Sequence, residues 1–306
     1  MISTRRTFLA TASVAPLLLR GAQTLRPIRL GGPIFLKSDD PEELASEHTR
    51  LGYSAAYCPA ADANDGDRIR AIKSAFEARN IVIAEVGAWR NILDPDPQKR
   101  SENLSYVIER MRLAEGVGAR CCVDIAGSFN PQLWYGPDPK NLSKEFFDAT
   151  VENCRKIVDD VKPRNTKFSI EMMPWNLPDG PDAYLKLIKA VDREGFGVHM
   201  DVCNAINSPA RFYRNSEIIA ELFRTLGQWL LSCHAKDLKW MDEYNVHFAE
   251  VVPGRGQIDY KTYLRKLAAA PVEAPLMLEH LKTPEEYAEG QDYIRKTGAA
   301  VGVKFV

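Results

Sequence analysis

Short apolar runs alternate with longer amphipathic runs eight times along this chain, and this alternation constrains the fold more than any other feature. The short runs are typical of buried parallel strands, and the longer runs are typical of helices that cover a sheet. The strand-like runs are Ile28–Phe35, Ser54–Pro59, Ile81–Gly87, Ala119–Ala126, Lys167–Met173, Gly195–Val202, Leu230–Lys236 and Ala274–Leu281. Eight strands that are each followed by a helix make a (β/α)8 barrel, so we predict an α/β fold with a single TIM barrel over residues 26–306.

The predicted helices have recognisable starts and stops. Asp40, Asp65, Ser143 and Thr283 are capping residues at the expected starts of the first, second, fourth and last helices, and Pro163 ends the fourth. A doubly wound open sheet is the competing fold, but no G-x-G-x-x-G turn follows the first strand. The chain also lacks a linker rich in Pro, Gly and Ser, which favours one domain.

The first residues differ from the rest of the chain. Arg5 and Arg6 precede Phe8, and an apolar run follows as far as Leu19. This pattern is typical of a secretory signal, and the paired arginines resemble a twin-arginine signal. We therefore expect a signal peptide over residues 1–25 and an exported, periplasmic protein, with an irregular N-terminal tail as the alternative. The apolar run is short for a membrane span, so no membrane contact beyond export is expected.

Charge and cysteine content exclude two classes of protein. The chain has 40 Lys and Arg against 41 Asp and Glu, so it offers no electrostatic reason to bind nucleic acid. None of its six cysteines forms a C-x-x-C pair, and disulfide frameworks belong to small domains with little core. We therefore expect the cysteines to be mainly buried apolar side chains.

The last four predicted strands each have one apolar face and one polar face. The apolar face must pack beneath the helices, so the polar face points to the barrel axis. Active sites of such barrels lie at the C-terminal mouth of the strands. There, four consecutive strands present ionisable side chains at comparable depth, namely Glu171, Asp201, His234 and Glu279.

Three carboxylates and one imidazole in one place predict a site for one divalent metal ion. Burial of these groups without a partner would cost several kcal/mol each. The oxygen-rich set favours Mn²⁺, with Mg²⁺ or Co²⁺ next and Zn²⁺ or Fe²⁺ left open. For any one of these residues alone, a buried salt bridge or a satisfied core histidine is the simpler interpretation. Their shared face and shared position at the strand ends favour a metal site.

The sequence around these residues resembles the sugar isomerase/epimerase superfamily of xylose isomerase-like TIM barrels, which includes ketose 3-epimerases, hydroxypyruvate isomerase and inosose dehydratase. The matching stretches are Ile170–Trp175, His199–Asn204, Cys233–Asp237, Pro253–Tyr260 and Leu278–His280. The resemblance covers nearly the whole chain after the predicted signal. It implies that Glu171, Asp201, His234 and Glu279 bind the metal and that the two glutamates also act as catalytic base and acid.

The resemblance implies proton abstraction next to a sugar carbonyl. Adjacent carbonyl and hydroxyl oxygens of a keto-sugar would chelate the metal, which stabilises the enediolate formed when a glutamate removes the C–H proton. Return of the proton gives epimerisation or isomerisation, so we expect a metal-dependent sugar isomerase or epimerase. Loss of an oxygen substituent from the β carbon would instead make the enzyme a lyase or dehydratase of a keto-sugar or 3-keto-glycoside, which is the alternative.

Several residues near the predicted mouth are candidates for substrate binding. Asn204 stands where ketose epimerases have a histidine, a departure that keeps the lyase alternative open. Lys236 or Arg255 is expected to replace an arginine that follows the histidine ligand in those enzymes. For Glu85, contact with substrate or an auxiliary acid–base role is weighed against a structural salt bridge. His199 is expected to bind substrate or to hydrogen-bond a metal ligand.

Aromatic residues in the expected mouth loops are Trp89, Trp134, Tyr135 and Trp175. They would stack on the C–H faces of a sugar, with core packing as the alternative, and we place Trp175 among the substrate-binding residues. The chain has no P-loop, and residues 253–256 are expected to form a tight turn rather than an anion site. An unphosphorylated sugar or glycoside is therefore the expected substrate.

Two further hypotheses are weaker. An endonuclease of the same superfamily needs a histidine-rich cluster of several metals, and this chain has only five histidines. A sugar-binding barrel without chemistry would have no need of both glutamates. A homo-oligomer is compatible with a barrel of this kind, although the sequence predicts no interface.

Overall fold

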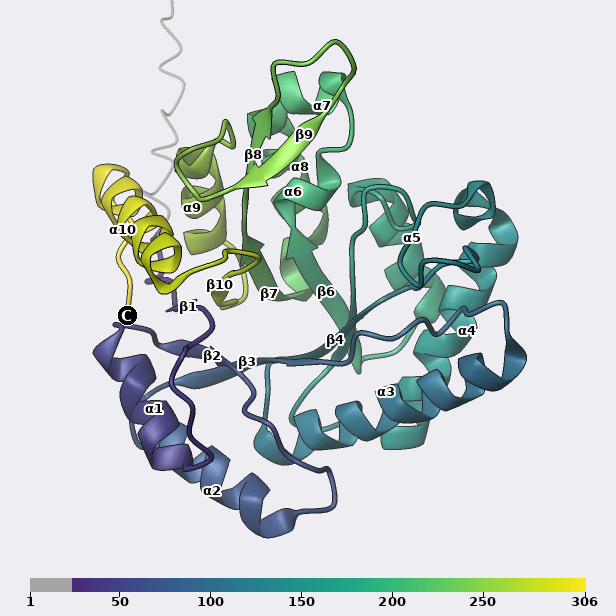
Figure 1. The fold of residues 1–306 in the computed structure, drawn as a ribbon, viewed down its shortest axis with the longest axis horizontal. Coiled ribbons are helices and arrows are strands. Elements are labelled where there is room, and N and C mark those ends of the chain that lie inside the picture. Colours follow the sequence, from purple (N-terminus) through teal and green to yellow (C-terminus); the bar gives the residue numbers. More distant parts are fainter. Residues whose placement is uncertain (1–23) are drawn as a thin grey trace, which may run out of the picture.

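The computed structural model describes residues 24–306, which form a closed barrel of parallel strands surrounded by helices (Figure 1). The strands follow one another around the barrel in the order β1-β10-β7-β6-β5-β4-β3-β2. They are β1 (Leu30–Gly31), β2 (Ala55–Tyr57), β3 (Val82–Gly87), β4 (Cys121–Ile125), β5 (Phe168–Glu171), β6 (Phe196–Asp201), β7 (Leu230–Ala235) and β10 (Leu276–Leu278). Each predicted strand run contains one of them, so the predicted fold class is confirmed. The predicted signal falls almost entirely on residues 1–23, outside the described part.

The helices begin where the capping residues predict. The side chains of Asp40, Asp65, Ser143 and Thr283 each accept a hydrogen bond from a first-turn N–H group. The main helices are α1 (Pro41–Arg50), α2 (Gly66–Glu77), α3 (Pro97–Val117), α4 (Lys144–Val161), α5 (Pro181–Val191), α8 (Asn215–Leu226), α9 (Tyr260–Ala268) and α10 (Pro284–Ala300). Shorter helical segments are α6 (Val202–Ala205), α7 (Pro209–Tyr213), η1 (Pro139–Leu142) and η2 (Gly227–Trp229).

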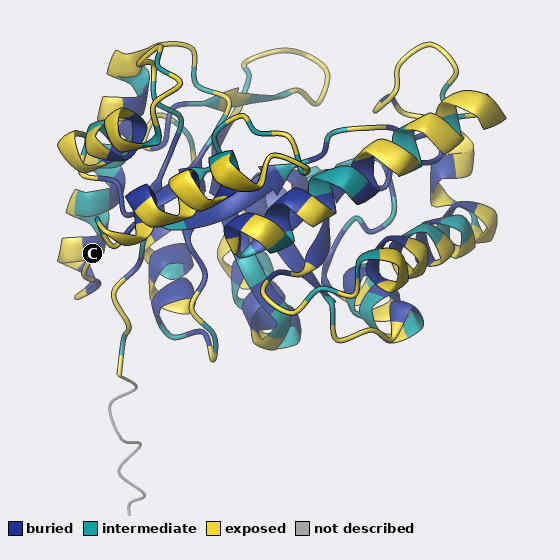
Figure 2. Ribbon diagram, turned by 90° about the horizontal axis from the view of Figure 1, so that it is seen from below, coloured by how far each residue is buried: buried dark blue, intermediate teal, exposed yellow. Residues whose placement is uncertain are grey.

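Two layers of buried side chains follow from the alternation along the strands. The outward-facing apolar residues pack beneath the helices in one large core, and Figure 2 shows buried strands beneath helices whose outer faces are exposed. A small separate cluster of Ala55, Ala84 and Met277 fills the barrel interior. The backbone approaches closely there, because a Cβ atom at Gly31 would lie 2.3 Å from the carbonyl oxygen of Ala55. In residues 24–306, no helix is long and apolar enough to cross a bilayer.

A β-hairpin that the sequence pattern did not predict follows β7. Its strands β8 (Asp237–Trp240) and β9 (Phe248–Val251) are antiparallel. Aromatic rings of the hairpin pack against α7. Phe212 stacks on Phe248 with ring centroids 4.8 Å apart, and Tyr213 stacks on Trp240 with centroids 5.2 Å apart. The hairpin therefore stands at the mouth of the barrel, next to α7 (Figure 1).

Candidate metal centre

Four side chains from consecutive barrel strands converge at the mouth. Each of Glu171, Asp201, His234 and Glu279 offers one ligand atom, and these atoms all lie within 4.8 Å of one another. The Nδ1 atom of His234 lies 3.2 Å from Glu171 Oε1, and it lies 3.5 Å from Asp201 Oδ2. It also lies 2.9 Å from Glu279 Oε2. The structure thus brings together all four residues that the sequence placed at the mouth.

Strand register and local hydrogen bonds orient the carboxylates of these four residues towards one another. Asp201 is paired with His234 between β6 and β7, and Glu279 follows the last residue of β10. Asp201 also caps α6, where its Oδ1 atom accepts a hydrogen bond from the backbone N–H of Asn204. The Nδ2 group of Asn204 donates to Glu171 Oε1 at 3.0 Å and to the carbonyl oxygen of Met172. Asn204 therefore fixes the carboxylates of Asp201 and Glu171, and Asp201 Oδ2 remains directed at the middle of the four-residue group.

The group fits a divalent cation. Asp201 Oδ2 and Glu279 Oε2 are buried, and besides the Lys236 ammonium at 2.9 and 2.7 Å they accept no well-aligned hydrogen bond, which leaves both oxygens able to bind a metal ion. Three carboxylate oxygens and one imidazole nitrogen suit Mn²⁺, Mg²⁺ or Zn²⁺. The structure therefore supports a site for one divalent metal ion, with its identity left open.

Lys236 lies against the same three carboxylates. Its Nζ atom is 2.9 Å from Asp201 Oδ2, 2.7 Å from Glu279 Oε2 and 3.6 Å from Glu171 Oε1. Burial lowers the pKa of Lys236, but these carboxylates raise it well above its ordinary value. Conversely, burial raises the pKa of Glu279, while His234 and Lys236 lower it to about 2. At neutral pH, Lys236 and Glu279 therefore form an ion pair at 2.7 Å beside the other carboxylates of the group.

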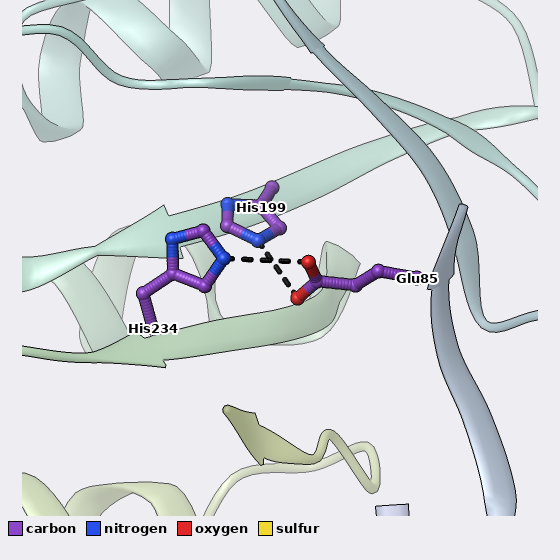
Figure 3. Close-up of side chains that lie close together, drawn as sticks. All are labelled: Glu85, His199 and His234. Atoms are coloured by element: carbon purple, nitrogen blue, oxygen red, sulfur yellow. Dashed lines mark hydrogen bonds and ion pairs between the residues drawn. The ribbon is translucent and has the colours of Figure 1, made fainter. Parts of the chain in front are cut away.

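A second group lies deeper in the barrel and contacts the other side of His234. The carboxylate of Glu85 faces both His199 and His234, as Figure 3 shows. Glu85 Oε1 is 3.0 Å from His199 Nε2, and Glu85 Oε2 is 3.3 Å from His234 Nε2. Ser232 also donates to Glu85 Oε1. With Nε2–H engaged by Glu85, the Nδ1 lone pair of His234 is available to a metal, the arrangement in which a carboxylate orients a ligating histidine.

Of the alternatives left open for Glu85, its position favours the structural salt bridge. Glu85 and His199 are buried and absent from the lining of the cavity at the mouth. Glu85 points into the barrel and is paired in register with Cys121, the first residue of β4, so it lies deeper than the strand ends. Burial raises the pKa of Glu85, but the two histidines lower it well below its ordinary range. Glu85 is therefore an ionised positioning residue.

Replacement of Glu85 by glutamine is expected to weaken Mn²⁺ binding by about 10- to 100-fold, the usual effect of losing the hydrogen-bond partner of a ligating histidine. Isothermal titration calorimetry on the folded variant measures this. Glu289→Gln is the matched control, because Glu289 lies on the surface and pairs with Arg255. An Mn²⁺ affinity within twofold of the parent would refute a role for Glu85 in orienting His234.

Metal binding is expected to release a proton at neutral pH. Burial lowers the pKa of His234, but Glu279, Glu171 and Glu85 raise it well above its ordinary value, so these carboxylates favour the ring that carries both protons in the metal-free protein. A metal needs the Nδ1 lone pair, so affinity should rise with pH by about tenfold per unit below that pKa. Calorimetry in two buffers of different ionisation enthalpy measures the proton released. Identical heats in both buffers would contradict the expectation.

A cavity of about 860 Å³ opens above the metal group. Of the predicted substrate-binding residues, Trp175, Asn204 and Lys236 line it, together with Glu171 and Glu279. Arg255 does not line it, since its guanidinium forms two hydrogen bonds to Glu289 at 2.7 and 2.5 Å. The expectation that Arg255 reaches the substrate is therefore not supported by its position.

The turn over residues 253–256 surrounds the carboxylate of Asp237, a side chain of the same protein. The carboxylate of Asp237 accepts hydrogen bonds from the backbone N–H groups of Gly254, Gly256 and Ile258. A Cβ atom at position 256 would lie 2.2 Å from Asp237 Oδ1, so glycine is required there. The amides of this turn are therefore occupied, in agreement with the expected tight turn.

Sequence reasoning missed two residues of the cavity wall. Glu250 and His280 line the cavity, and Glu250 Oε2 lies 2.9 Å from His280 Nδ1. Glu250 comes from the unpredicted hairpin, so no sequence signal placed it at the mouth. His280 directly follows Glu279 and has a φ of 60°, a left-handed conformation that turns a residue away from the strand direction.

Comparison with known proteins was informative at the level of family and fold. A family model described as the xylose isomerase-like TIM barrel matches residues 49–297. The chain belongs to this family. No curated protein matches it in a sequence search.

Three solved structures of similar proteins share this xylose isomerase-like barrel. A protein from Mycobacterium smegmatis in complex with magnesium is 16% identical, with a TM-score of 0.64 over 90% of this chain and 97% of the other. The 3-keto-D-glucoside 4-epimerase of E. coli is 13% identical, with a TM-score of 0.64 over 88% and 99%. The D-psicose 3-epimerase of Clostridium cellulolyticum is 16% identical, with a TM-score of 0.59 over 84% and 93%. Identities of this size establish a common fold.

Proposed function

We propose that this protein is a metal-dependent isomerase or epimerase that moves a proton at the carbon next to the carbonyl of an unphosphorylated sugar or glycoside. One observation carries the proposal, namely the convergence of two glutamates, an aspartate and a histidine at the floor of an open cavity. In the barrel, β7 and β6 separate β10 from β5, so Glu279 and Glu171 approach from the two ends of the group. Two carboxylates in these positions can serve opposite faces of one substrate carbon.

The related structures support this choice of chemistry. One is an epimerase of 3-keto-D-glucosides, and another is an epimerase of D-psicose whose structure contains D-tagatose. A third contains magnesium. We extend sugar epimerisation and a requirement for a divalent ion from these proteins to the present chain, and we favour Mn²⁺ because its site is rich in carboxylate oxygens.

In the proposed mechanism, a divalent ion held by Glu171, Asp201, His234 and Glu279 would act as a Lewis acid on the adjacent oxygens of the substrate. One glutamate removes the proton from the neighbouring carbon, and the other returns a proton to the opposite face. Asn204 keeps Glu171 oriented through its 3.0 Å hydrogen bond. Lys236, buried beside three carboxylates, compensates their negative charge and offers an ammonium donor to a substrate oxygen.

The cavity lining supports an uncharged substrate. Lys236 is the one lysine in that lining, which holds no arginine, and its ammonium already faces carboxylates. The amides of the neighbouring turn are bound to Asp237. Among the described residues, a phosphate group there would meet Glu171, Glu250 and Glu279, because the basic side chains of the lining, Lys236 and His280, already face carboxylates.

Elimination is the second candidate activity, and the presence of Asn204 is the observation that supports it. In the ketose epimerases that the sequence resembles, a histidine stands at this position, whereas here an amide that cannot act as an acid or base donates a hydrogen bond to Glu171. The same proton abstraction followed by loss of a β-oxygen substituent would make the enzyme a lyase.

Incubation of the Mn²⁺-loaded protein with 3-keto-glucosides and ketoses in D₂O, followed by proton NMR and mass spectrometry, tests the proposal. Incorporation of one deuterium with retention of the carbon skeleton is the expected result for an isomerase or epimerase. Release of water or aglycone would show the lyase. Absence of both deuterium incorporation and release across the panel would refute a proton-transfer enzyme.

A further inference from the structure

Aromatic side chains gather along one wall of the cavity, on the loops that follow three neighbouring strands. Trp89 follows β3, Trp134 and Tyr135 lie in the loop after β4, and Trp175 follows β5. Trp134 and Tyr135 are 39% and 38% exposed, whereas Glu171 at the cavity floor is 5% exposed. These rings therefore form an outer part of the cavity, above the metal group.

A network of buried polar side chains ties these three loops together. Asn91 Nδ2 donates to the carbonyl oxygen of Ser128, and Asn91 Oδ1 accepts from the Ser128 backbone N–H. Asn141 Nδ2 donates to Ser128 Oγ at 2.9 Å and to Asn176 Oδ1 at 2.8 Å. Asn176 Nδ2 in turn donates to the carbonyl oxygen of Gly127. All four side chains are at most 2% exposed, so these hydrogen bonds are shielded from water.

The aromatic residues are themselves held in place. Trp175 Nε1 donates to the carbonyl oxygen of Tyr135 at 2.7 Å, which joins the loops after β4 and β5 at the rings. The rings of Trp134 and Tyr135 meet edge to face at 5.2 Å. Trp89 has a φ of 31°, and a Cβ atom at Gly87 would lie 2.2 Å from its Nε1 atom. Large apolar rings that are fixed in place and still half exposed are typical of a preformed binding surface.

The chemistry of this outer part selects an apolar ligand. The two amide side chains in the cavity lining are already engaged, because Asn204 bonds Glu171 and Asn207 Nδ2 donates to the carbonyl oxygen of Pro174. Across from these loops, the hairpin contributes the apolar side chains of Val246 and Phe248. A volume of about 860 Å³ also lies near the upper end of the range for small-molecule sites, so one sugar ring would leave much of it empty.

We propose that the wall formed by Trp89, Trp134, Tyr135 and Trp175 is a subsite for a flat, uncharged aromatic aglycone. The substrate is then an aryl glycoside whose sugar ring lies at the metal group and whose aglycone stacks on the aromatic wall. The position of the sugar rests on the proposed function, whereas the subsite rests on the aromatic wall and its polar network. A second sugar ring is the competing occupant, because Trp134, Tyr135 and His280 also bring polar groups to the lining, and the cellobiose titration below distinguishes the two.

Binding of unreactive ligands tests the subsite without requiring turnover. Phenyl β-glucoside, methyl β-glucoside and cellobiose are titrated into the Mn²⁺-loaded protein by calorimetry. We expect phenyl β-glucoside to bind at least about tenfold more tightly than the other two, the affinity difference that burial of one aromatic ring supplies. Trp134→Ala should remove most of this preference and leave the affinity for methyl β-glucoside within about twofold.

Tyr244→Ala is the control, because Tyr244 is fully exposed on the hairpin and lies outside the cavity lining. It should leave all three affinities unchanged. Asn141→Leu removes the central residue of the network, and it should lower the affinity for phenyl β-glucoside selectively. Equal affinities for phenyl and methyl glucosides, or a preference for cellobiose, would overturn the proposed aglycone. The two proposals can be told apart. If no deuterium enters any substrate but phenyl β-glucoside still binds more tightly, the proposed reaction is refuted and the proposed subsite is supported.

Discussion

Glutamine in place of Glu171 or Glu279 is expected to slow exchange of substrate protons with D₂O by about 10²- to 10⁴-fold, the usual contribution of a positioned acid or base. The amide keeps an oxygen that can face the metal, but it can neither accept nor return a proton. Both residues converge on His234 Nδ1, at 3.2 and 2.9 Å. Exchange rates are measured by NMR at saturating Mn²⁺, with bound metal quantified in each variant.

Glu250→Gln separates proton transfer from a general loss of negative charge. Glu250 also lines the cavity, and its Oε1 atom lies 3.9 Å from Lys236, but it is outside the metal group. We expect the exchange rate of Glu250→Gln to fall by about tenfold at most, because this variant retains both catalytic carboxylates. Exchange at the parental rate in both Glu171→Gln and Glu279→Gln would exclude these residues as base and acid.

The second large effect is expected for Asp201→Asn, which should weaken Mn²⁺ binding by about 10²- to 10³-fold. Asp201 is completely buried, and Lys236 and His234 both face its carboxylate. Loss of one partner from a buried charged group costs about 3–5 kcal/mol, and 1.4 kcal/mol corresponds to tenfold in affinity. Calorimetry gives the affinity, and the rise in Tm on addition of Mn²⁺ should shrink in parallel.

A buried aspartate two strands away in the barrel provides the matched control. Asp124 lies in β4 between Val123 and Ile125, on the side of the strand that packs beneath the helices, and its Oδ1 atom accepts from the backbone N–H groups of Arg90 and Ile125. Burial raises the pKa of Asp124 well above its ordinary value, and an asparagine keeps an oxygen that can accept both backbone hydrogen bonds. Asp124→Asn should leave Mn²⁺ affinity unchanged. Equal losses in the two variants would mean that Asp201 acts only through the fold.

The barrel and its metal group were predictable because each depends on short-range regularities. Alternation along β5 to β7 separates Phe168 and Met200, which pack beneath the helices, from Glu171 and Asp201, which face the axis. Since parallel strands of a closed barrel end at one mouth, the parity of each strand was enough to bring these side chains together.

The remaining features depend on irregularities that a single sequence does not display. The depth of Glu85 depends on the register between strands, which pairs it with the first residue of β4 and brings it to His234 instead of the cavity lining. The hairpin after β7 interrupts the barrel pattern and delivers Glu250 to the cavity. The ion pair of Arg255 with Glu289 was not predicted, because Glu289 lies on α10, 34 residues along the chain.

Anomalous diffraction from crystals grown with Mn²⁺ tests the central claim most directly. The account predicts one anomalous peak at the barrel mouth, within about 2.0–2.3 Å of the facing atoms of Glu171, Asp201, His234 and Glu279, the distances usual for such ligands. A map without a peak there at saturating Mn²⁺, or with a peak bound by other side chains, would contradict the assignment of these residues as metal ligands.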